Sequence, residues 1–290
     1  MQHKFSSRYL FVIFILCYEL FFPAIVLSAE DPLVMAIFPR RNAAATITMF
    51  KPMASYLSQQ LGREVKLVTA KNFHAFWKGV VTNQYDIVHY NQYHYIKSHE
   101  DYGYEVILKN EEFGQSLIAG ALVVRKDSGI ETLQDLRGKK ILFGGGPKAM
   151  QSYIVTTLML RRAGLMKGDY QELFAKNPPN ACVAVYQKHA DAAGTGDLII
   201  RFPAIKKKID TKKIRFLALS EKMPQLPWAV KGDMAPELRS KIQSTLSVLN
   251  NSEAGRSILQ KAKLTNLLTV DDAQYDLHRN IIKELATFPK

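Results

Sequence analysis

The stretch Ile141 to Tyr153, ILFGGGPKAMQSY, decides what kind of fold this chain can form. An apolar run with strand character passes through three glycines, Gly144 to Gly146, into a segment with a helical pattern. The first turn of a helix carries backbone N–H groups without intrahelical partners, and the helix dipole places positive charge there. The stretch therefore predicts a strand, a tight loop and a helix whose start can hold a ligand.

Strand and helix patterns alternate on both sides of this stretch. The strands expected before it are 33–38, 64–69 and 85–90, with helices at 50–61 and 73–81 between them. The later strands expected are 121–125, 140–143, 191–195 and 214–219, with helices at 182–189 and near 236–249, 253–262 and 272–286. Such alternation predicts an α/β fold, in which helices cover sheets with parallel cores and the crossovers are right-handed.

The order of these patterns predicts two lobes with a cleft between them. Residues 30–120 together with 220–290 are expected to form lobe 1, and residues 121–219 to form lobe 2. Ligands of open parallel sheets bind outside the carboxyl ends of the strands. The segments that directly follow strands are therefore the candidate site.

The first 29 residues read as a secretory signal peptide. Lys4 and Arg8 precede a mostly apolar run from Tyr9 to Val26, and Leu27-Ser28-Ala29 resembles a cleavage site. An uncleaved membrane anchor is the alternative, although Glu19 and Pro23 interrupt the run. The sequence predicts export to the periplasm.

The composition is that of a globular exported protein. The chain has 290 residues, 47% of them hydrophobic, and a formal net charge of +13. Its cysteines are Cys17, in the signal segment, and Cys182, which is expected to be a small core residue rather than a nucleophile. An exported basic chain meets anionic solutes and envelope polymers, so no nucleic-acid partner is expected. The mature chain is expected to be a monomer.

Four pieces of sequence carry a family resemblance. They are FKPMASYL at 50–57 with Leu61-Gly62, YDIV at 85–88, VRKDSGI at 124–130 with Leu133 and Asp135-Leu136, and GKKILFG at 138–144. In order and spacing the chain resembles the periplasmic substrate-binding proteins of phosphate, phosphite and phosphonate ABC transporters, of the phosphonate-binding type. The resemblance implies a type II periplasmic binding fold that closes over a ligand and delivers it to a membrane transporter.

The ligand motif of that family is not kept. Where relatives carry a Ser-Thr-Ser run that holds phosphonate oxygens, this chain has Ala149-Met150-Gln151. The histidine of the family falls on Pro178, its glycine-containing turn becomes Tyr90-Asn91-Gln92, and its aromatic crossover strand becomes Ile118-Ala119-Gly120. An acidic residue is kept as Asp197. The ligand is therefore not expected to be a simple phosphonate.

Twelve residues are predicted to contact the ligand. They are Phe38, Arg40, Tyr90, Asn91, Gln92, Tyr93, Lys148, Ala149, Met150, Gln151, Ser152 and Asp197. Two kinds of pocket remain open: an apolar one walled by Met150 and aromatic rings, or an anion site that uses Lys148, Arg40 and Arg41. Asp197 is equally expected as the cap of a helix that begins near Leu198.

Enzymatic and metal-dependent functions are not indicated. His89, His94 and His99 are spaced five apart, which places them on one face of neither a helix nor a strand. His74 and Trp77 are expected to be packing residues, and no hydrolase motif is present. The expected function is that of a periplasmic solute-binding protein without cofactor. The alternatives are a carrier of an apolar or lipid-like ligand and a sensory ligand-binding module.

Overall fold

The structure, a computed structural model, describes residues 30–289. The predicted signal peptide, residues 1–29, lies outside this range. Residues 32–289 group into one compact unit. Among the described residues, no helix is both long enough and apolar enough to cross a membrane.

The first sheet has six strands in the order β13-β4-β12-β3-β1-β2. Its strands are β1 (Leu33–Ile37), β2 (Val65–Thr69), β3 (Ile87–His89), β4 (Glu105–Glu111), β12 (Pro227–Val230) and β13 (Asn266–Thr269). β1 pairs in parallel with β2 and β3, whereas β12 and β13 pair antiparallel to their neighbours. The carboxyl ends of β1, β2 and β3 therefore lie at one edge.

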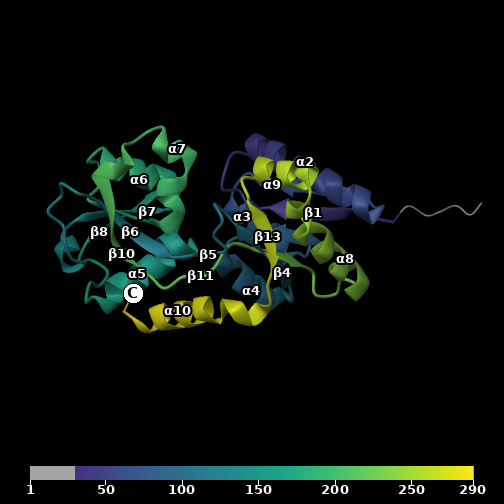
Figure 1. Cartoon of the computed structure of the whole chain (residues 1–290). Coiled ribbons are helices and arrows are strands. Elements are labelled where there is room, and N and C mark those ends of the chain that lie inside the picture. Colours follow the sequence, from purple (N-terminus) through teal and green to yellow (C-terminus); the bar gives the residue numbers. More distant parts are fainter. Residues whose placement is uncertain (1–29, 290) are drawn as a thin grey trace, which may run out of the picture. The chain divides into compact units, whose positions relative to one another are not determined.

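Five helices accompany this sheet (Figure 1). They are α2 (Ala43–Leu61), α3 (Phe73–Val81), α4 (Gln92–Tyr102), α8 (Pro236–Ser247) and α9 (Glu253–Ala262). One apolar cluster joins β1 to α2, α8 and α9 and contains the buried Met53, Leu57, Ile242 and Leu259. A second joins the opposite side of the sheet to α3 and α4 through Phe76 and Ile96. Burial of each such side chain contributes about 1.5–3 kcal/mol.

The second sheet has five strands in the order β10-β6-β9-β7-β8. Its strands are β6 (Gly120–Arg125), β7 (Lys140–Gly144), β8 (Gln171–Ala175), β9 (Ala192–Gly196) and β10 (Ile214–Leu219). β7 pairs in parallel with β8 and β9, and β6 is antiparallel to both β9 and β10. The helical elements are η3 (Met150–Val155), α5 (Thr156–Arg162), α6 (Pro178–Tyr186), η4 (Asp197–Arg201) and α7 (Pro203–Lys206).

The predicted α/β class with two parallel-containing sheets is confirmed. A short two-stranded sheet of β5 (Leu117–Ile118) and β11 (Met223–Pro224) lies in the two segments that connect the larger sheets. The helix expected at 182–189 is α6, which begins earlier because the Asn177 side chain caps it. The lobe boundaries at 120/121 and 219/220 stay a prediction.

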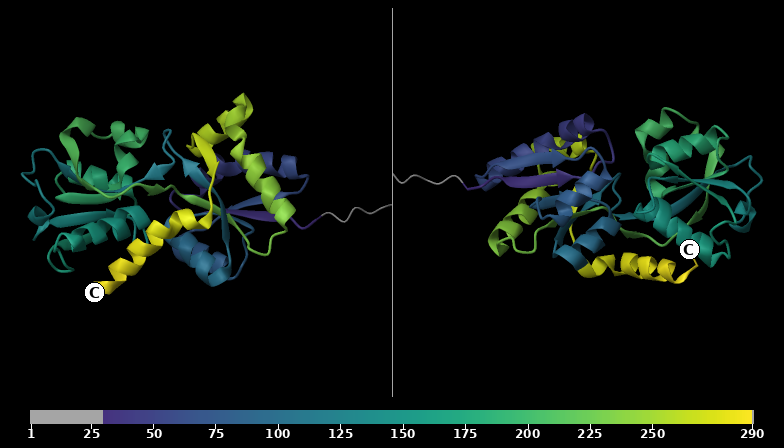
Figure 2. Two further views of the ribbon diagram at one scale, coloured as in Figure 1. Left: turned by 60° about the horizontal axis from the view of Figure 1, so that its bottom comes forward. Right: turned by 180° about the vertical axis from the view of Figure 1, so that it is seen from behind.

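The C-terminal helix α10 (Asp276–Thr287) contacts α4, which accompanies the first sheet, and η3 and α5, which accompany the second. The right-hand view of Figure 2 shows α10 running below both groups of elements. Ile281 joins an apolar cluster with Met150, Ile154 and Leu158 of η3 and α5. Tyr93 of α4 packs against the same cluster. On the surface, Arg162 of α5 donates to both carboxylate oxygens of Glu284 at 2.7 and 2.6 Å. The residues after β7 are thus tied to the end of the chain.

Candidate functional site

The segments that follow the parallel strands are rich in cations. They are 38–42, 70–72 and 90–91 after β1, β2 and β3, and 145–149 and 176–177 after β7 and β8. These segments contain five cationic residues, Arg40, Arg41, Lys71, Lys148 and Lys176, and no carboxylate. Asp197, which opens η4 directly after β9, is the first acidic residue met at these strand ends.

Most helices that start at these segments are capped by asparagine. Asn42, Asn72, Asn91 and Asn177 precede α2, α3, α4 and α6, and each side-chain oxygen accepts the N–H three residues later. Such a cap satisfies an unpaired donor without adding negative charge. η3 differs, because Ala149 stands at its cap position and provides no side-chain cap. Its first turn keeps the donors that the other helices share with their caps.

η3 is a single π-helical segment that lies close against the second sheet. A Cβ on Gly194 would lie 2.2 Å from the Ser152 carbonyl oxygen, and one on Gly120 would lie 2.5 Å from Cγ1 of Val155. Glycine at these two strand positions therefore allows the close approach. The Ser152 hydroxyl donates to the Gly144 carbonyl at 2.5 Å, so it is engaged by the backbone. π-Helical turns of this kind are frequent at functional sites.

A hydrogen bond joins the starts of α4 and η3. The Asn91 side chain accepts the N–H of His94 at 2.9 Å and donates from Nδ2 to the Lys148 carbonyl at 3.0 Å. Burial, together with the charge of Lys148, lowers the pKa of His94 to about 4. The hydrogen bond from Asn91 places Lys148 beside the start of α4, and the lowered pKa keeps the His94 ring neutral at physiological pH.

The segment after β1 carries two adjacent arginines. Arg40 lies 3.8 Å from the Glu112 carboxylate, and its guanidinium lies 5.5 Å from the centre of the Phe38 ring. Arg41 is exposed. Partial desolvation of its guanidinium by neighbouring atoms lowers its pKa, and the charge of Arg40 lowers it further, while the charge of Glu112 raises it. The single negative charge of Glu112 can neutralise only one of the two guanidinium groups. The segment therefore keeps net positive charge.

Several predicted ligand residues are buried in packing interactions. Tyr90 is fully buried, and its hydroxyl lies 2.6 Å from the Ser98 hydroxyl. Gln92 donates to the Pro224 carbonyl at 3.0 Å. Met150 is 1% exposed within the cluster that contains Ile281. Gln151 lies 3.3 Å from Nε2 of His278 on α10.

Asp197 is hydrogen-bonded to the connection between β5 and β6 and does not cap a helix. Its carboxylate accepts the Ala119 N–H at 3.1 Å, and its own N–H donates to the Ala119 carbonyl at 3.0 Å. η4 is preceded by Gly196 and has no side-chain cap. The expectation that Asp197 caps this helix was wrong, because the side chain turns back to the preceding connection.

Cys182 and the three histidines spaced five apart in the sequence lie in packed surroundings. Cys182 is fully buried, as predicted, and burial raises its pKa to about 12. His99 on α4 bonds the Tyr104 carbonyl through Nδ1 at 2.8 Å. Among residues 30–289, no group of three or more His, Cys, Asp or Glu side chains is placed to hold a metal ion.

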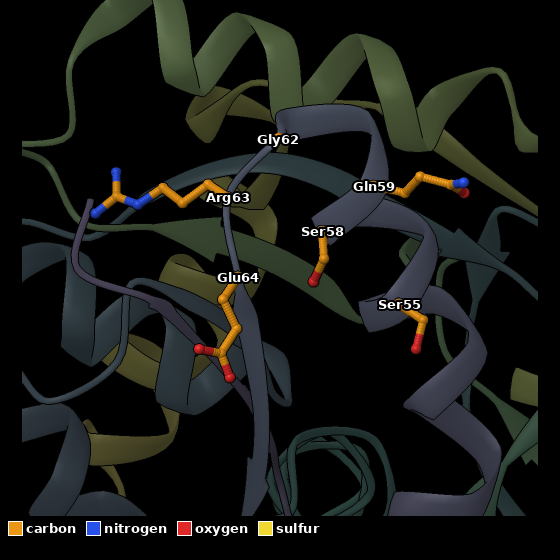
Figure 3. Close-up of a pocket in the computed structure, with 6 residues that line it drawn as sticks. All are labelled: Ser55, Ser58, Gln59, Gly62, Arg63 and Glu64. Atoms are coloured by element: carbon orange, nitrogen blue, oxygen red, sulfur yellow. The ribbon is translucent and has the colours of Figure 1, made fainter. Parts of the chain in front are cut away.

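A polar depression lies at the opposite edge of the first sheet (Figure 3). Its lining comes from the end of α2 and the start of β2: Ser55, Ser58, Gln59, Gly62, Arg63 and Glu64. The Ser58 hydroxyl already donates to the Ala54 carbonyl and accepts the Val65 N–H. Because it lies at the amino end of β2, this depression is separate from the cationic edge.

Sequence reasoning missed three residues near the site. Glu112 follows the antiparallel strand β4. It was not considered, because candidate residues were sought only after strands expected to be parallel. Phe73 opens α3 after β2 and contacts both Phe38 and His94. His278 lies 127 residues from its partner Gln151, and no local pattern signals that contact. Only Phe73, which directly follows a cap at a strand end, carried a usable signal.

The sequence matches a family described as the periplasmic substrate-binding proteins of phosphonate ABC transporters, over residues 35–275. Among solved structures, a phosphonate transporter binding component from Pseudomonas aeruginosa is similar with a TM-score of 0.75 and 16% identity, covering 88% of this chain and 86% of that one. PhnD1 from Prochlorococcus marinus in complex with methylphosphonate also has a TM-score of 0.75 and 16% identity, covering 89% and 99%. At these identities the likeness shows the fold.

A curated relative has a different role. The tetrathionate sensor histidine kinase TtrS of Salmonella typhimurium is 26% identical over 215 residues, which are 70% of this chain. The chain spans about a third of the length of that relative, since the match covers 35% of it.

Proposed function

Because the chain belongs to the periplasmic substrate-binding proteins of phosphonate ABC transporters, we propose that it binds an oxyanion mainly through charge, at the start of η3. The family is one of substrate-binding proteins, and its members are periplasmic. In this proposal the ligand lies against the glycine loop before Ala149, with Lys148 on one side and Arg40 and Arg41 on the other. The ligand is released unchanged.

The observation that carries the proposal is the charge of the strand ends. Five cations and no carboxylate occupy the segments after β1, β2, β3, β7 and β8, and Asp197 after β9 is the one acidic residue at the described parallel strand ends. Neutral asparagine caps, where aspartate would serve equally well, leave the positive helix ends uncompensated. Such an edge attracts anions over several ångströms and binds them in a salt-dependent manner.

The packing of Met150 argues against the apolar-ligand alternative. Its side chain is 1% exposed and contacts residues of η3, α5 and α10, so it already fills a core position. A methionine placed this way stabilises the packing of α10 and leaves little of its surface to a ligand. At this position, a side chain that packs against α10 therefore replaces the hydroxyl with which the family binds phosphonate oxygens.

Simple phosphonates are expected to bind weakly. Ala149 and Met150 lack the hydroxyl donors of the family motif, and Ser152 donates to the Gly144 carbonyl. Each lost hydrogen bond to a charged partner is worth about 1.5–3 kcal/mol. Two such losses lower affinity by orders of magnitude. Sub-micromolar binding of methylphosphonate or phosphate in calorimetry would contradict this expectation.

Paired variants at the glycine loop separate the two kinds of ligand. We expect Lys148→Ala and Arg41→Gln to weaken binding of oxyanion probes strongly and to reduce its salt dependence. Met150→Ser is expected to lower stability, with little direct effect on affinity. The probes are phosphate, methylphosphonate, sulfate and tetrathionate, measured by calorimetry at two salt concentrations. Lys212→Ala, an exposed cation outside these segments, is the control. Unchanged binding in both cation variants would refute the charge-based site.

The natural ligand can be identified directly. Native mass spectrometry of protein purified gently from its own periplasm should show a bound species carrying negative charge. Recovery of the same species after incubation would support binding without turnover. A bound lipid or other uncharged molecule would favour the apolar-carrier alternative instead.

A sensory role is the second candidate, and the likeness to a tetrathionate sensor kinase favours it. In that case occupancy is reported to a membrane receptor instead of a transporter. Crosslinking in the native host, followed by identification of the captured membrane protein, distinguishes the two: a permease supports transport and a histidine kinase supports sensing. The same experiment tests whether the protein works as a monomer and whether the predicted signal peptide has been removed.

A further inference from the structure

An exposed aromatic ring lies at the cation-rich edge of the first sheet. Phe73, the first residue of α3, is 42% exposed. Its ring is nearly parallel to that of His94, with centroids 5.9 Å apart, and meets the edge of Phe38 at 6.1 Å. Trp77, one turn further along α3, lies 5.3 Å from His94. These four residues form what we call the aromatic shelf.

Core packing does not account for the open side of Phe73. The buried face of α3 consists of Phe76, Gly79 and Val80, which already fill the space against the sheet. Within residues 30–289, eight large hydrophobic residues are exposed: Phe73, Tyr102, Phe113, Leu117, Leu173, Phe174, Leu219 and Val248. Phe73 is the member of this set that immediately follows one of the cationic segments, 70–72.

The shelf lies beside the cations of the proposed site. Arg40 sits over the Phe38 ring, and the charge of Lys148 acts on His94. Asn91 connects the same end of α4 to the Lys148 carbonyl. An exposed aromatic ring next to concentrated positive charge suits a ligand that has a planar ring and an anionic group.

We propose that the aromatic shelf receives the planar ring of an aryl oxyanion, a ligand in which an aromatic ring is joined to a phosphonate, phosphate or sulfonate group. The inference rests on the proposed function, because the cations hold the anionic group while Phe73 selects the group attached to it. Phe73 is then a specificity-determining residue. The ring then contributes part of the affinity that the family's hydroxyl motif supplies in its relatives.

Two probes that differ in one group test the shelf. Phenylphosphonate and methylphosphonate present the same anion, so the ratio of their affinities isolates the ring. Stacking on an exposed aromatic side chain is worth enough for phenylphosphonate to bind about tenfold tighter. In Phe73→Ala the ratio should fall to about one with methylphosphonate affinity unchanged, and Phe73→Tyr should restore it. Phe174→Ala, which removes an equally exposed ring from β8, should leave the ratio at about ten.

The outcomes for the shelf and for the charge-based site are separable. Equal affinity for the two probes, or a ratio that survives Phe73→Ala, overturns the shelf and leaves the anion site intact. Absence of detectable binding of both probes at millimolar concentration also overturns the shelf, and the anion site is then judged on sulfate and tetrathionate. Insensitivity of every oxyanion to Lys148→Ala and Arg41→Gln refutes the proposed function instead.

Discussion

The starts of α4 and η3 lie against each other and are built in opposite ways. α4 is capped by Asn91, whose side chain satisfies the N–H of His94. The residue at the cap position of η3 is Ala149, which has no side-chain cap bond, although Asn91 donates to the Lys148 carbonyl just before it. At the start of α4, the Asn91 side chain accepts a hydrogen bond from a backbone N–H of the first turn. At the start of η3, the first backbone N–H groups are left to water or to a ligand, which is the arrangement expected of an anion site.

The same contrast appears in how each helix start is supported. The α4 side relies on a local asparagine and on the neutral His94, three residues away. The η3 side relies on glycines of distant strands and on His278 of α10, which contacts Gln151. A site held by long-range packing is more sensitive to substitution than one held by a cap.

The largest expected effect concerns the support of η3. In Gly194→Ala the new Cβ would lie 2.2 Å from the Ser152 carbonyl oxygen and 2.5 Å from the Phe143 ring, so η3 must shift. We expect the free energy of unfolding to fall by about 3 kcal/mol. Urea denaturation measures the loss. Gly146→Ala, in the loop before η3, meets no atom within 4 Å and is the matched control. Equal stability of the two variants would show that η3 does not lie as close to the sheet.

Acid should weaken both helix starts through their histidines. Burial lowers the pKa of His278 to about 3 and that of His94 to about 4, against about 6.5 in the unfolded chain. Above pH 6.5 both states are neutral and these groups do not affect stability. Below it the unfolded chain takes up protons first, so stability falls as the pH drops toward 4. The slope is about 1.4 kcal/mol per pH unit for each histidine.

Denaturation midpoints at pH 7, 6 and 5 measure this slope. His278→Gln should make the decline shallower, because one titrating group has been removed from the buried side of η3. A flat profile between pH 7 and 5 in the parent protein would contradict the burial of these rings.

The sequence predicted the fold better than it predicted the state of the site. Alternating strand and helix patterns are local, so β1, α2, β7 and the terminal helices were recovered. α4 was not foreseen, because its residues are mostly polar and its clearest signal is the cap Asn91. The cations after strands could be placed at the sheet edge from topology alone. The burial of Met150 against α10 could not, because it depends on residues more than 100 positions away.

A smaller effect separates a cap from a contact. Asn72→Ala removes only the cap of α3 and should lower the free energy of unfolding by about 1 kcal/mol. Asn91→Ala removes the cap of α4, the bond to the His94 ring and the bond to the Lys148 carbonyl, and each of the two further bonds adds about 0.5–1.5 kcal/mol. Urea denaturation of the two variants gives the difference directly. Equal losses would show that the α4 and η3 starts are not joined in solution.

The smallest stability effect is the one that most directly tests the open start of η3. Ala149 has φ −79° and ψ 106°, an extended conformation that suits a helix cap. Ala149→Asp should therefore supply the missing cap and raise the free energy of unfolding by about 0.5–1 kcal/mol. The same carboxylate occupies the donors and repels an anion, so oxyanion binding should be lost.

Ala149→Asn separates charge from occupancy, since it adds a cap without negative charge. It should stabilise the protein to a similar extent and weaken oxyanion binding less than the aspartate does. Thermal denaturation and calorimetry with sulfate or tetrathionate, at low and high salt, provide both readouts. Stabilisation together with lost binding means that the ligand and the cap compete for the same N–H groups. If either variant binds oxyanions as well as the parent protein, the start of η3 is not the anion site, and the contrast with α4 has only a structural meaning.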